Sequence, residues 1–143
     1  MMILFFILAA MASLAPGRSH ITNATAIASV VLEEAPLFKG DDSRLKTAAL
    51  VVAIAFRESS FRNDVTSKTH DSCMMQINRR PDLAEDPAAC VRVAMTMLRE
   101  SMRMCREPLA FYAEGPRGCT SERAARISRD RMAIAKRLAK VQP

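Results

Sequence analysis

The sequence predicts a mainly helical α+β domain, in which a compact helical body carries a small β-hairpin or irregular lobe. Three observations favour this fold class. Half of the 143 residues are apolar, which is enough for one compact core. Only four residues are glycine. Apolar residues recur at helical spacings of three and four, and the β-branched alternation typical of strands does not recur.

The first stretch, MMILFFILAAMASLAPG, is apolar and uncharged. It is shorter than the roughly 20 apolar residues that span a bilayer. Ala10-Met11-Ala12 has the small-x-small pattern that signal peptidase reads. We therefore expect residues 1–12 to be a signal peptide that is cleaved after Ala12, and cleavage at residues 15–19 is the later alternative. Residues 20–143 are expected to form a single domain. A retained membrane anchor is the alternative, and no Lys or Arg precedes the apolar run.

The first helix of the expected domain runs from Ile21 to about Glu34, and Pro36 stops it. The sequence KGDDS at 39–43 indicates a turn into the next helix, for which Asp42 or Ser43 is a suitable N-cap. That helix, Arg44 to about Glu58, is apolar on nearly all sides, which is typical of a helix in the centre of a core.

Residues 59–80 lose the helical period, and polar Gln76 between Met75 and Ile77 suits a hairpin or an irregular lobe. Asp86-Pro87 opens a third long helix, because Pro is tolerated in a first turn and Asp complements the helix dipole. A short helix is expected at Leu109 to Ala113, and the last helix begins near Ser121. Its inward residues are expected to be Ala124, Ile127, Ile134, Leu138 and Val141.

Four cysteines, an even number, suit disulfides in a chain that leaves the cytosol. They allow three connectivities. We favour Cys73–Cys90 and Cys105–Cys119, because each pair joins neighbouring elements across a modest loop. A zinc site made by all four thiolates is the alternative, but the chain has no C-x-x-C pair. His20 and His70 are isolated and expected at the surface, so we expect no metal and no cofactor.

The net charge is +6, and the apolar leader contributes none of it. Such a charge favours a polyanionic partner, namely nucleic acid, anionic lipid or bacterial cell wall. Nucleic acid is disfavoured, because the chain has one Tyr, no Trp and no helix-turn-helix or zinc-finger spacing. We expect the basic residues to be spread along solvated helix faces.

Glu58 ends the helix that we expect to be most buried. Desolvation by apolar neighbours and the negative end of the helix dipole both raise the pKa of a carboxyl group there. A raised pKa is what a general acid for glycoside cleavage requires. The alternative is that Glu58 points into solvent at a frayed helix end.

Three segments follow one another in the chain: Glu58-Ser59-Ser60-Phe61, then Cys73-Met74-Met75-Gln76-Ile77-Asn78, then Ala110-Phe111-Tyr112-Ala113-Glu114-Gly115-Pro116. Together they resemble the signatures of the lysozyme-like lytic transglycosylases that cut bacterial peptidoglycan. Those signatures are E-S-x-F with the catalytic Glu, G-L-M-Q, and A-x-Y-N-A-G-P. The resemblance covers roughly residues 45–120. Cys73 stands where the family has Gly, and Glu114 follows Ala113 where N-A is expected.

The resemblance implies that Glu58 is the sole acid/base and that the substrate is the glycan strand of peptidoglycan. Glu58 would protonate the oxygen between N-acetylmuramic acid and N-acetylglucosamine. It would then deprotonate the 6-hydroxyl of the muramic acid, which closes a 1,6-anhydro ring. One carboxylate suffices, because the sugar supplies the nucleophile.

The resemblance also implies a set of substrate-binding residues. These are Ser59, Ser60, Met75, Gln76, Asn78 and Tyr112. The two serines would orient Glu58 or a neighbouring loop. Met75 and Gln76 would line the cleft, with the Gln76 amide on a sugar N-acetyl group. Tyr112 would place its hydroxyl near Glu58 or the substrate, or would be a core tyrosine.

Two further interpretations stay open. DSCMMQINRR, residues 71–80, also looks like the D-x-G-x-x-Q-I-N-S-R run of animal-type lysozymes, in which the Asp is the second catalytic carboxylate. If Asp71 and Glu58 flank the cleft at about 5 Å, a retaining hydrolase becomes possible. The fold could also serve as a non-catalytic peptidoglycan-binding module with Glu58 idle. A disulfide at Cys73 would brace the hairpin in place of the family's glycine and so favour an intact site, whereas an unpaired Cys73 would favour the non-catalytic module.

These observations lead to one expected function. We expect an exported, monomeric peptidoglycan-cleaving enzyme of bacterial or phage-related origin, located in the periplasm or outside the cell. It would have no nucleic-acid partner and no stable membrane span after signal cleavage. A basic membrane-active or nucleic-acid-binding peptide is a third class, and the scarcity of stacking aromatic residues argues against nucleic acid.

Overall fold

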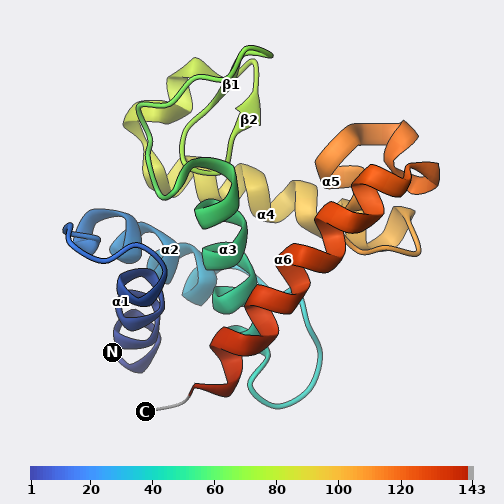
Figure 1. Cartoon of the computed structure of the whole chain (residues 1–143). Coiled ribbons are helices and arrows are strands. Elements are labelled where there is room, and N and C mark those ends of the chain that lie inside the picture. The colour runs from blue at the N-terminus through green and yellow to red at the C-terminus, as the bar shows by residue number, and fades with distance from the viewer. Residues whose placement is uncertain (142–143) are drawn as a thin grey trace.

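The computed structural model describes residues 1–141, which form six α-helices and one two-stranded sheet (Figure 1). The predicted fold class, mainly helical with a small β lobe, is confirmed. The helices are α1 (Met2–Leu14), α2 (Ile21–Glu33), α3 (Ser43–Ser59), α4 (Pro87–Met104), α5 (Ala110–Glu114) and α6 (Glu122–Lys140). Two 3-10 helices, η1 (Pro81–Glu85) and η2 (Gly115–Thr120), were not expected from the sequence.

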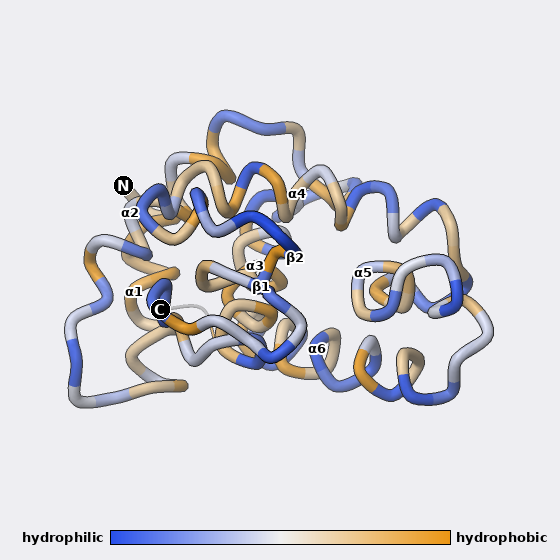
Figure 2. Tube along the Cα trace, turned by 90° about the horizontal axis from the view of Figure 1, so that it is seen from above, coloured by the Kyte–Doolittle hydropathy of each residue, from blue (hydrophilic) through white to orange (hydrophobic). Residues whose placement is uncertain are grey.

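Helix α3 is the central element. Every residue from Thr47 to Ala55 is buried, as its apolar character on all sides predicts. Helices α1, α2 and α6 pack against it, and α4 packs on α2. Figure 2 shows hydrophobic residues gathered around α3, whereas α6 alternates between hydrophilic and hydrophobic stretches. The helix that ends at the candidate site is therefore held on several sides.

The β lobe is a minimal hairpin. Strand β1 (Asp71–Ser72) runs antiparallel to β2 (Ile77–Asn78), with Asp71 opposite Asn78 and Ser72 opposite Ile77. The lobe lies beyond the carboxyl end of α3, whereas the amino end of α1 and the carboxyl end of α6 lie at the opposite end of the molecule (Figure 1).

Both disulfides join the β lobe or a 3-10 helix to a long helix. Cys73–Cys90 ties the hairpin turn to α4, and Cys105–Cys119 ties the end of α4 to η2. These are the pairs that the sequence favoured. Because the four cysteines are paired in two disulfides, the alternative of a zinc site made by four thiolates is wrong.

The predicted helix starts are largely confirmed. The Asp86 carboxylate accepts the N–H of Ala89 at 2.9 Å and caps α4, and the Ser121 hydroxyl accepts the N–H of Ala124 at 3.1 Å and caps α6. Asp42, one of the two predicted candidates, is the N-cap residue of α3, but it has a positive φ of 57° and its side chain makes no capping hydrogen bond.

Two expected positions are wrong. Val141 was expected to face the core, but α6 ends at Lys140 and Val141 is 73% exposed. His20 was expected at the surface and is buried instead. Its Nε2 lies 2.7 Å from the carbonyl of Ala15, and its ring packs edge-on against Phe61, with 5.4 Å between the ring centroids.

The apolar leader forms α1, which packs on α2 and α3 and buries Phe6, Ile7, Ala10 and Met11. Cleavage after Ala12 stays a prediction, and it would expose the apolar faces of α2 and α3 that these residues cover. Across the described residues, we find no helix with both the length and the hydropathy of a membrane span.

Candidate active site

Glu58 lies in the last turn of α3, and the chain leaves the helix sharply after it. Ser60 and Phe61 both have positive φ, 52° and 64°, in the left-handed region that side chains other than glycine rarely adopt. Their N–H groups bond to the carbonyls of Phe56 and Ala55, at 2.8 Å and 3.3 Å, and so cap the helix. Such residues cost of order 1 kcal/mol each and persist where surrounding contacts hold them.

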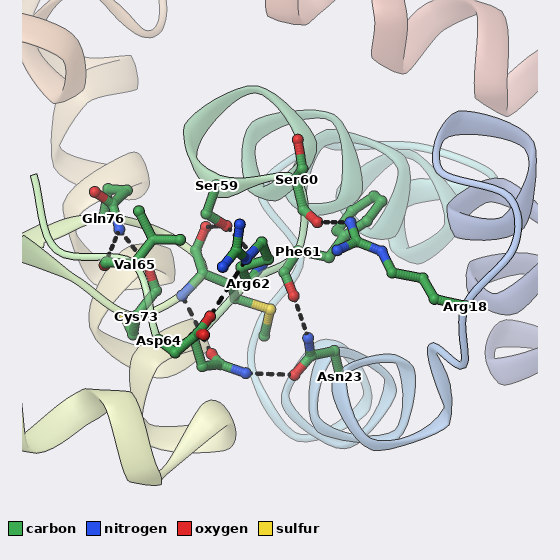
Figure 3. Close-up of polar contacts among 12 residues, drawn as sticks. Arg18, Asn23, Ser59, Ser60, Phe61, Arg62, Asp64, Val65, Cys73 and Gln76 are labelled. Carbon is green, nitrogen blue, oxygen red and sulfur yellow. Dashed lines mark hydrogen bonds and ion pairs between the residues drawn. The ribbon is translucent and has the colours of Figure 1, made fainter.

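The contacts that hold this turn come from α2 and the segment before it, as Figure 3 shows. The side-chain amide of Asn23 donates to the carbonyl of Phe61 at 2.7 Å, and the guanidinium of Arg18 donates to the carbonyl of Ser60. The buried Phe61 ring packs against Phe56, with 5.8 Å between the centroids. The turn after Glu58 is therefore anchored through both its backbone and its side chains.

Arg131 of α6 forms an ion pair with Glu58. Its Nη2 lies 3.2 Å from Oε1 of Glu58, and the two side chains are only 15% and 26% exposed. The Nε of Arg131 is buried and has no hydrogen-bond partner. Arg131 also contacts Asp130, which pairs with Arg57 at 2.9 Å, so alternating charges from α3 and α6 lie together.

The environment of Glu58 favours its protonated form. Burial raises the pKa of Glu58 above its ordinary value, and the negative charge of Asp71 acts in the same direction. The charge and the hydrogen bond of Arg131 oppose that rise without cancelling it. The direction agrees with the prediction made from the sequence, and Arg131 is the feature that the sequence reasoning missed.

Asp71 lies on β1 as an ionised, well-bonded carboxylate. Its Oδ2 accepts the hydroxyls of Ser67 and Thr69, both at 2.6 Å, and its Oδ1 accepts the amide of Asn78 at 2.9 Å. Partial burial alone would raise the pKa of Asp71, but these hydrogen bonds outweigh it and hold the pKa below its ordinary value. Asn78 is exposed and also donates to the carbonyl of Thr69 at 2.8 Å.

Tyr112 of α5 links the site to the β lobe through the backbone. Its hydroxyl donates to the carbonyl of Met75 at 2.9 Å, while the Met75 side chain is fully buried. Burial, followed by the negative charge of Glu58, raises the pKa of Tyr112 far above its ordinary value, so the phenol stays neutral. The backbone N–H of Tyr112 donates to the hydroxyl of Ser101 at 3.0 Å, which fixes the start of α5.

Two polar side chains join the end of α3 to the hairpin turn. The Ser59 hydroxyl donates to the carbonyl of Met74 at 2.8 Å. The Asn63 side chain accepts the N–H of Met74 at 3.2 Å and donates to Asn23 at 2.8 Å. Ser59 therefore contacts the lobe, whereas Ser60 is exposed at the helix end.

Gln76 stabilises the turn between the two strands. Its amide nitrogen donates to the carbonyls of Val65 and Cys73, at 3.0 Å and 2.9 Å (Figure 3). Gln76 and Cys73 both have positive φ, 51° and 61°. The turn is therefore held by two hydrogen bonds of the Gln76 side-chain amide and by the Cys73–Cys90 disulfide.

A signal for Arg131 was present in the sequence. It lies four residues after Ile127 and three before Ile134, two residues that the sequence predicts to face inward, so it falls on the inward face of that helix. An arginine on such a face requires a partner. The partner, 73 residues away in the chain, could not be chosen without the fold.

Residues 1–141 contain no group of three His, Cys, Asp or Glu side chains placed to hold a metal ion. A cavity of about 400 Å³ lies at the other end of α3 and is not lined by Glu58.

Comparison with known proteins settles the family. Residues 38–132 match the transglycosylase SLT domain. The chain belongs to this family. The match spans α3, the β lobe, α4 and α5, and it includes both Glu58 and Arg131. Family membership supports a peptidoglycan substrate and transglycosylase-type activity at the level of the family. No curated protein and no solved structure matched the chain.

Within this SLT domain, the two departures from the family signatures have different structural settings. Cys73 has the left-handed conformation that suits glycine, and its disulfide holds it there. Glu114 has one buried carboxylate oxygen without a hydrogen-bond partner, 3.5 Å from a guanidinium nitrogen of Arg123. Gly118 permits η2 to lie on α5, because a Cβ there would meet the carbonyl oxygen of Ala110 at 2.0 Å.

Proposed function

We propose that this SLT domain is a lytic transglycosylase that cleaves the β-1,4 bond between N-acetylmuramic acid and N-acetylglucosamine. It leaves a 1,6-anhydromuramic acid end, with Glu58 as the single acid/base. The observation that carries the proposal is the largely buried Glu58 carboxyl at the end of α3, with its raised pKa and its ion pair to Arg131.

The reaction needs one carboxyl group and no water. Protonated Glu58 donates its proton to the glycosidic oxygen as the bond from that oxygen to C1 of the muramic acid breaks, and N-acetylglucosamine leaves as an alcohol. The Glu58 carboxylate then takes the proton of the 6-hydroxyl as O6 bonds to C1. Glu58 returns to its protonated form, and every atom of the strand is kept in the two products.

Arg131 is the positioning residue in this proposal. Burial and Asp71 favour neutral Glu58, whereas Arg131 favours the carboxylate, so both forms are accessible during one turnover. The 3.2 Å contact also fixes the direction of the carboxyl group. Because Arg131 carries its charge throughout, it stabilises the carboxylate at the moment when the proton has left.

The β lobe and α5 would supply the sugar contacts. The amide nitrogen of Gln76 is engaged by two carbonyls, so its amide oxygen is the group available to accept an N-acetyl N–H. Exposed Asn78 and the neutral Tyr112 hydroxyl are further hydrogen-bonding groups. Met75 would take part through its carbonyl, which Tyr112 binds, and through the packing of its buried side chain. Ser59 would position the lobe relative to Glu58.

One observation favours a second candidate, a lysozyme-type muramidase. Asp71 is ionised, and its charge acts on Glu58. In a retaining hydrolase such a carboxylate is the nucleophile or stabilises the cation, and water enters the product. The three hydrogen bonds that Asp71 accepts from its own lobe favour the single-acid mechanism instead.

We also propose export to the periplasm or outside a bacterial cell. Two disulfides fit a protein that folds outside the cytosol, and peptidoglycan is located there. Signal cleavage near Ala12 and a monomeric state belong to the same proposal.

The test is mass spectrometry of the fragments released from purified peptidoglycan by the protein with its disulfides intact. Anhydro-muropeptides that persist with Asp71→Asn and vanish with Glu58→Gln are expected. Products heavier by one water that vanish with both variants would establish the muramidase. Absence of fragments, with sedimentation onto the wall retained, would make the chain a binding module.

A further inference from the structure

The arginines and the lysines of this chain are used differently. Every ion pair of the described residues uses an arginine, and none uses any of the five lysines. Four of those five lysines lie in two short segments, residues 39–46 and 136–140. The lysines, none of which is in an ion pair of the described residues, are therefore concentrated in two segments of the chain.

Three of these lysines surround an apolar cavity of about 400 Å³ between α6 and the start of α3. The lysines are Lys46, Lys136 and Lys140, and all three are exposed. The floor consists of Phe38, Met132, Ala135 and Ala139. On α6 the contributing residues recur at spacings of three and four, so one face of the helix supplies most of the lining. We refer to these seven residues as the lysine-rimmed cavity.

We propose that the lysine-rimmed cavity docks the protein on the surface of an anionic lipid bilayer. Lysine side chains have long apolar stems that lie along an apolar surface while the ammonium group reaches anionic headgroups. An apolar floor with an unpaired cationic rim is the composition of helix surfaces that bind at the membrane interface. The proposed binding is peripheral, with the protein on the surface of the bilayer.

Charge and apolar exposure favour a bilayer over an acidic protein. Exposed Val141 follows directly on α6, and exposed Phe5 of α1 lines a second cavity together with Leu138 and Val141. Arg137 adds a further exposed cation without an ion pair in the described part of the chain. Asp41 and Asp42 lie close to Lys46 in the chain, and Glu107 lines a further cavity together with Lys136. The four lysines of the two segments and Arg137 outnumber these three carboxylates, so the local charge stays positive. A broad apolar end with unpaired cations fits a fluid anionic surface, whereas an acidic protein would need fixed partner groups.

The docked orientation leaves the candidate active site free. Lys46 is near the first turn of α3 and Glu58 is in its last turn, 12 residues later, which corresponds to about 18 Å along the helix axis. The β lobe lies beyond the carboxyl end of α3, whereas the start of α3 and the end of α6, which line the cavity, lie toward the opposite end of the molecule (Figure 1). None of the seven residues belongs to α1, so the leader contributes nothing to the lysine-rimmed cavity itself, although it contributes Phe5 to the adjoining apolar surface.

The experiment is sedimentation of the full chain with vesicles of phosphatidylcholine alone and with vesicles that also contain phosphatidylglycerol. The wild-type chain is expected to sediment with the anionic vesicles only. Lys46→Gln/Lys136→Gln/Lys140→Gln is expected to lower that partitioning by about a hundredfold at low salt, because each lysine contributes a similar electrostatic factor.

The matched control is Arg103→Gln/Arg106→Gln/Arg117→Gln. It removes the same charge at three exposed arginines without ion pairs in the described residues, near the end of α4 and in η2. This control is expected to partition within about threefold of the wild-type chain. Three results would overturn the proposal. The first is that the wild-type chain does not sediment with anionic vesicles, which would leave an acidic protein as the occupant. The second is an equal loss of partitioning in both triple variants. The third is equal binding of the wild-type chain to both vesicle types.

Discussion

The two ends of α3 carry opposite kinds of electrostatic environment. At the carboxyl end, Glu58 and Arg131 are largely buried and paired, and the backbone next to them is strained and held by side-chain hydrogen bonds. At the amino end, Lys46 is exposed and has no ion pair within the described residues. Buried pairs fix geometry and tune acidity, whereas exposed single charges contribute little to stability and remain free to bind. One helix thus joins a site suited to chemistry with a surface suited to attachment.

The largest expected effect on stability comes from the brace of the hairpin turn. Loss of Cys73–Cys90, by Cys73→Ala/Cys90→Ala, is expected to lower the free energy of unfolding by about 3 kcal/mol in the chain-entropy account. Chemical denaturation measures it. By comparison, the triple lysine variant at the other end of α3 is expected to stay within about 0.5 kcal/mol of the wild-type chain.

A second variant separates the brace from the backbone strain. Cys73→Gly/Cys90→Ala also lacks the disulfide, but glycine adopts the positive φ of 61° at little cost. It is expected to be more stable than the Ala/Ala variant by about 1 kcal/mol. If the Gly/Ala variant is instead the less stable of the two, the positive φ of residue 73 does not cost stability, and the backbone there is not strained.

The next effect sharpens the contrast between paired and unpaired charges. Arg131→Met removes the cation that lowers the pKa of Glu58, so burial and Asp71 raise that pKa further. Because the general acid must be protonated, the alkaline limb of the pH–rate profile is expected to move to higher pH. The maximal rate is expected to fall by about tenfold to a hundredfold as the carboxyl group loses its orientation.

Two controls accompany this variant. Arg131→Lys keeps the charge and is expected to restore most of the pH profile, because the Coulombic part of the effect remains. Arg92→Met breaks the exposed pair with Glu33, which has the shorter distance of 2.9 Å, and is expected to leave the pH profile unchanged. An unchanged profile in Arg131→Met would contradict the role given to Arg131.

The smallest effect concerns Asp71, on the lobe side of the comparison. The pKa of Asp71 is lowered in the folded state, so its carboxylate contributes stability above the unfolded pKa of about 3.9, and that contribution is lost as the pH falls through the folded pKa. Asp71→Asn is expected to lower the free energy of unfolding by about 1 kcal/mol at neutral pH. The difference should vanish in strong acid, as thermal unfolding at several pH values would show.

The matched control for Asp71 is Asp64→Asn. Asp64 pairs with Arg62 at 3.4 Å, and both side chains are exposed, so no measurable change in stability is expected. If the difference in the free energy of unfolding between the wild-type chain and Asp71→Asn instead grew as the pH fell, the stabilising role given to the Asp71 carboxylate would be contradicted.

Local sequence signals sufficed for the long helices α2, α3, α4 and α6 and for the side-chain caps of α4 and α6. Asp86-Pro87 and Ser121 mark the starts of α4 and α6, and the all-apolar run before Glu58 predicts the buried helix α3. The disulfide pairing followed from short loops between neighbouring elements. These features depend on residues that are close in the chain, which is why the sequence alone predicts them.

The remaining features depend on how distant elements meet. Arg131 reaches Glu58 only because α6 crosses α3, and the sequence shows only that an arginine lies on the inward face of α6. The Gln76 amide nitrogen donates to the carbonyls of Val65 and Cys73, contacts that the sequence did not reveal, and the binding of a sugar by its amide oxygen stays a prediction. The cluster of unpaired lysines likewise forms only when the two ends of the domain come together.

The measurement that tests the central contrast most directly is the release of anhydro-muropeptides from purified peptidoglycan by three proteins. These are the wild-type chain, Glu58→Gln and the triple lysine variant. The wild-type chain and the lysine variant are expected to release the same anhydro products at similar rates in the absence of vesicles. Glu58→Gln is expected to be slower by at least about a hundredfold. Anhydro products released by Glu58→Gln at the wild-type rate would contradict the account, because the chemistry would then lie elsewhere.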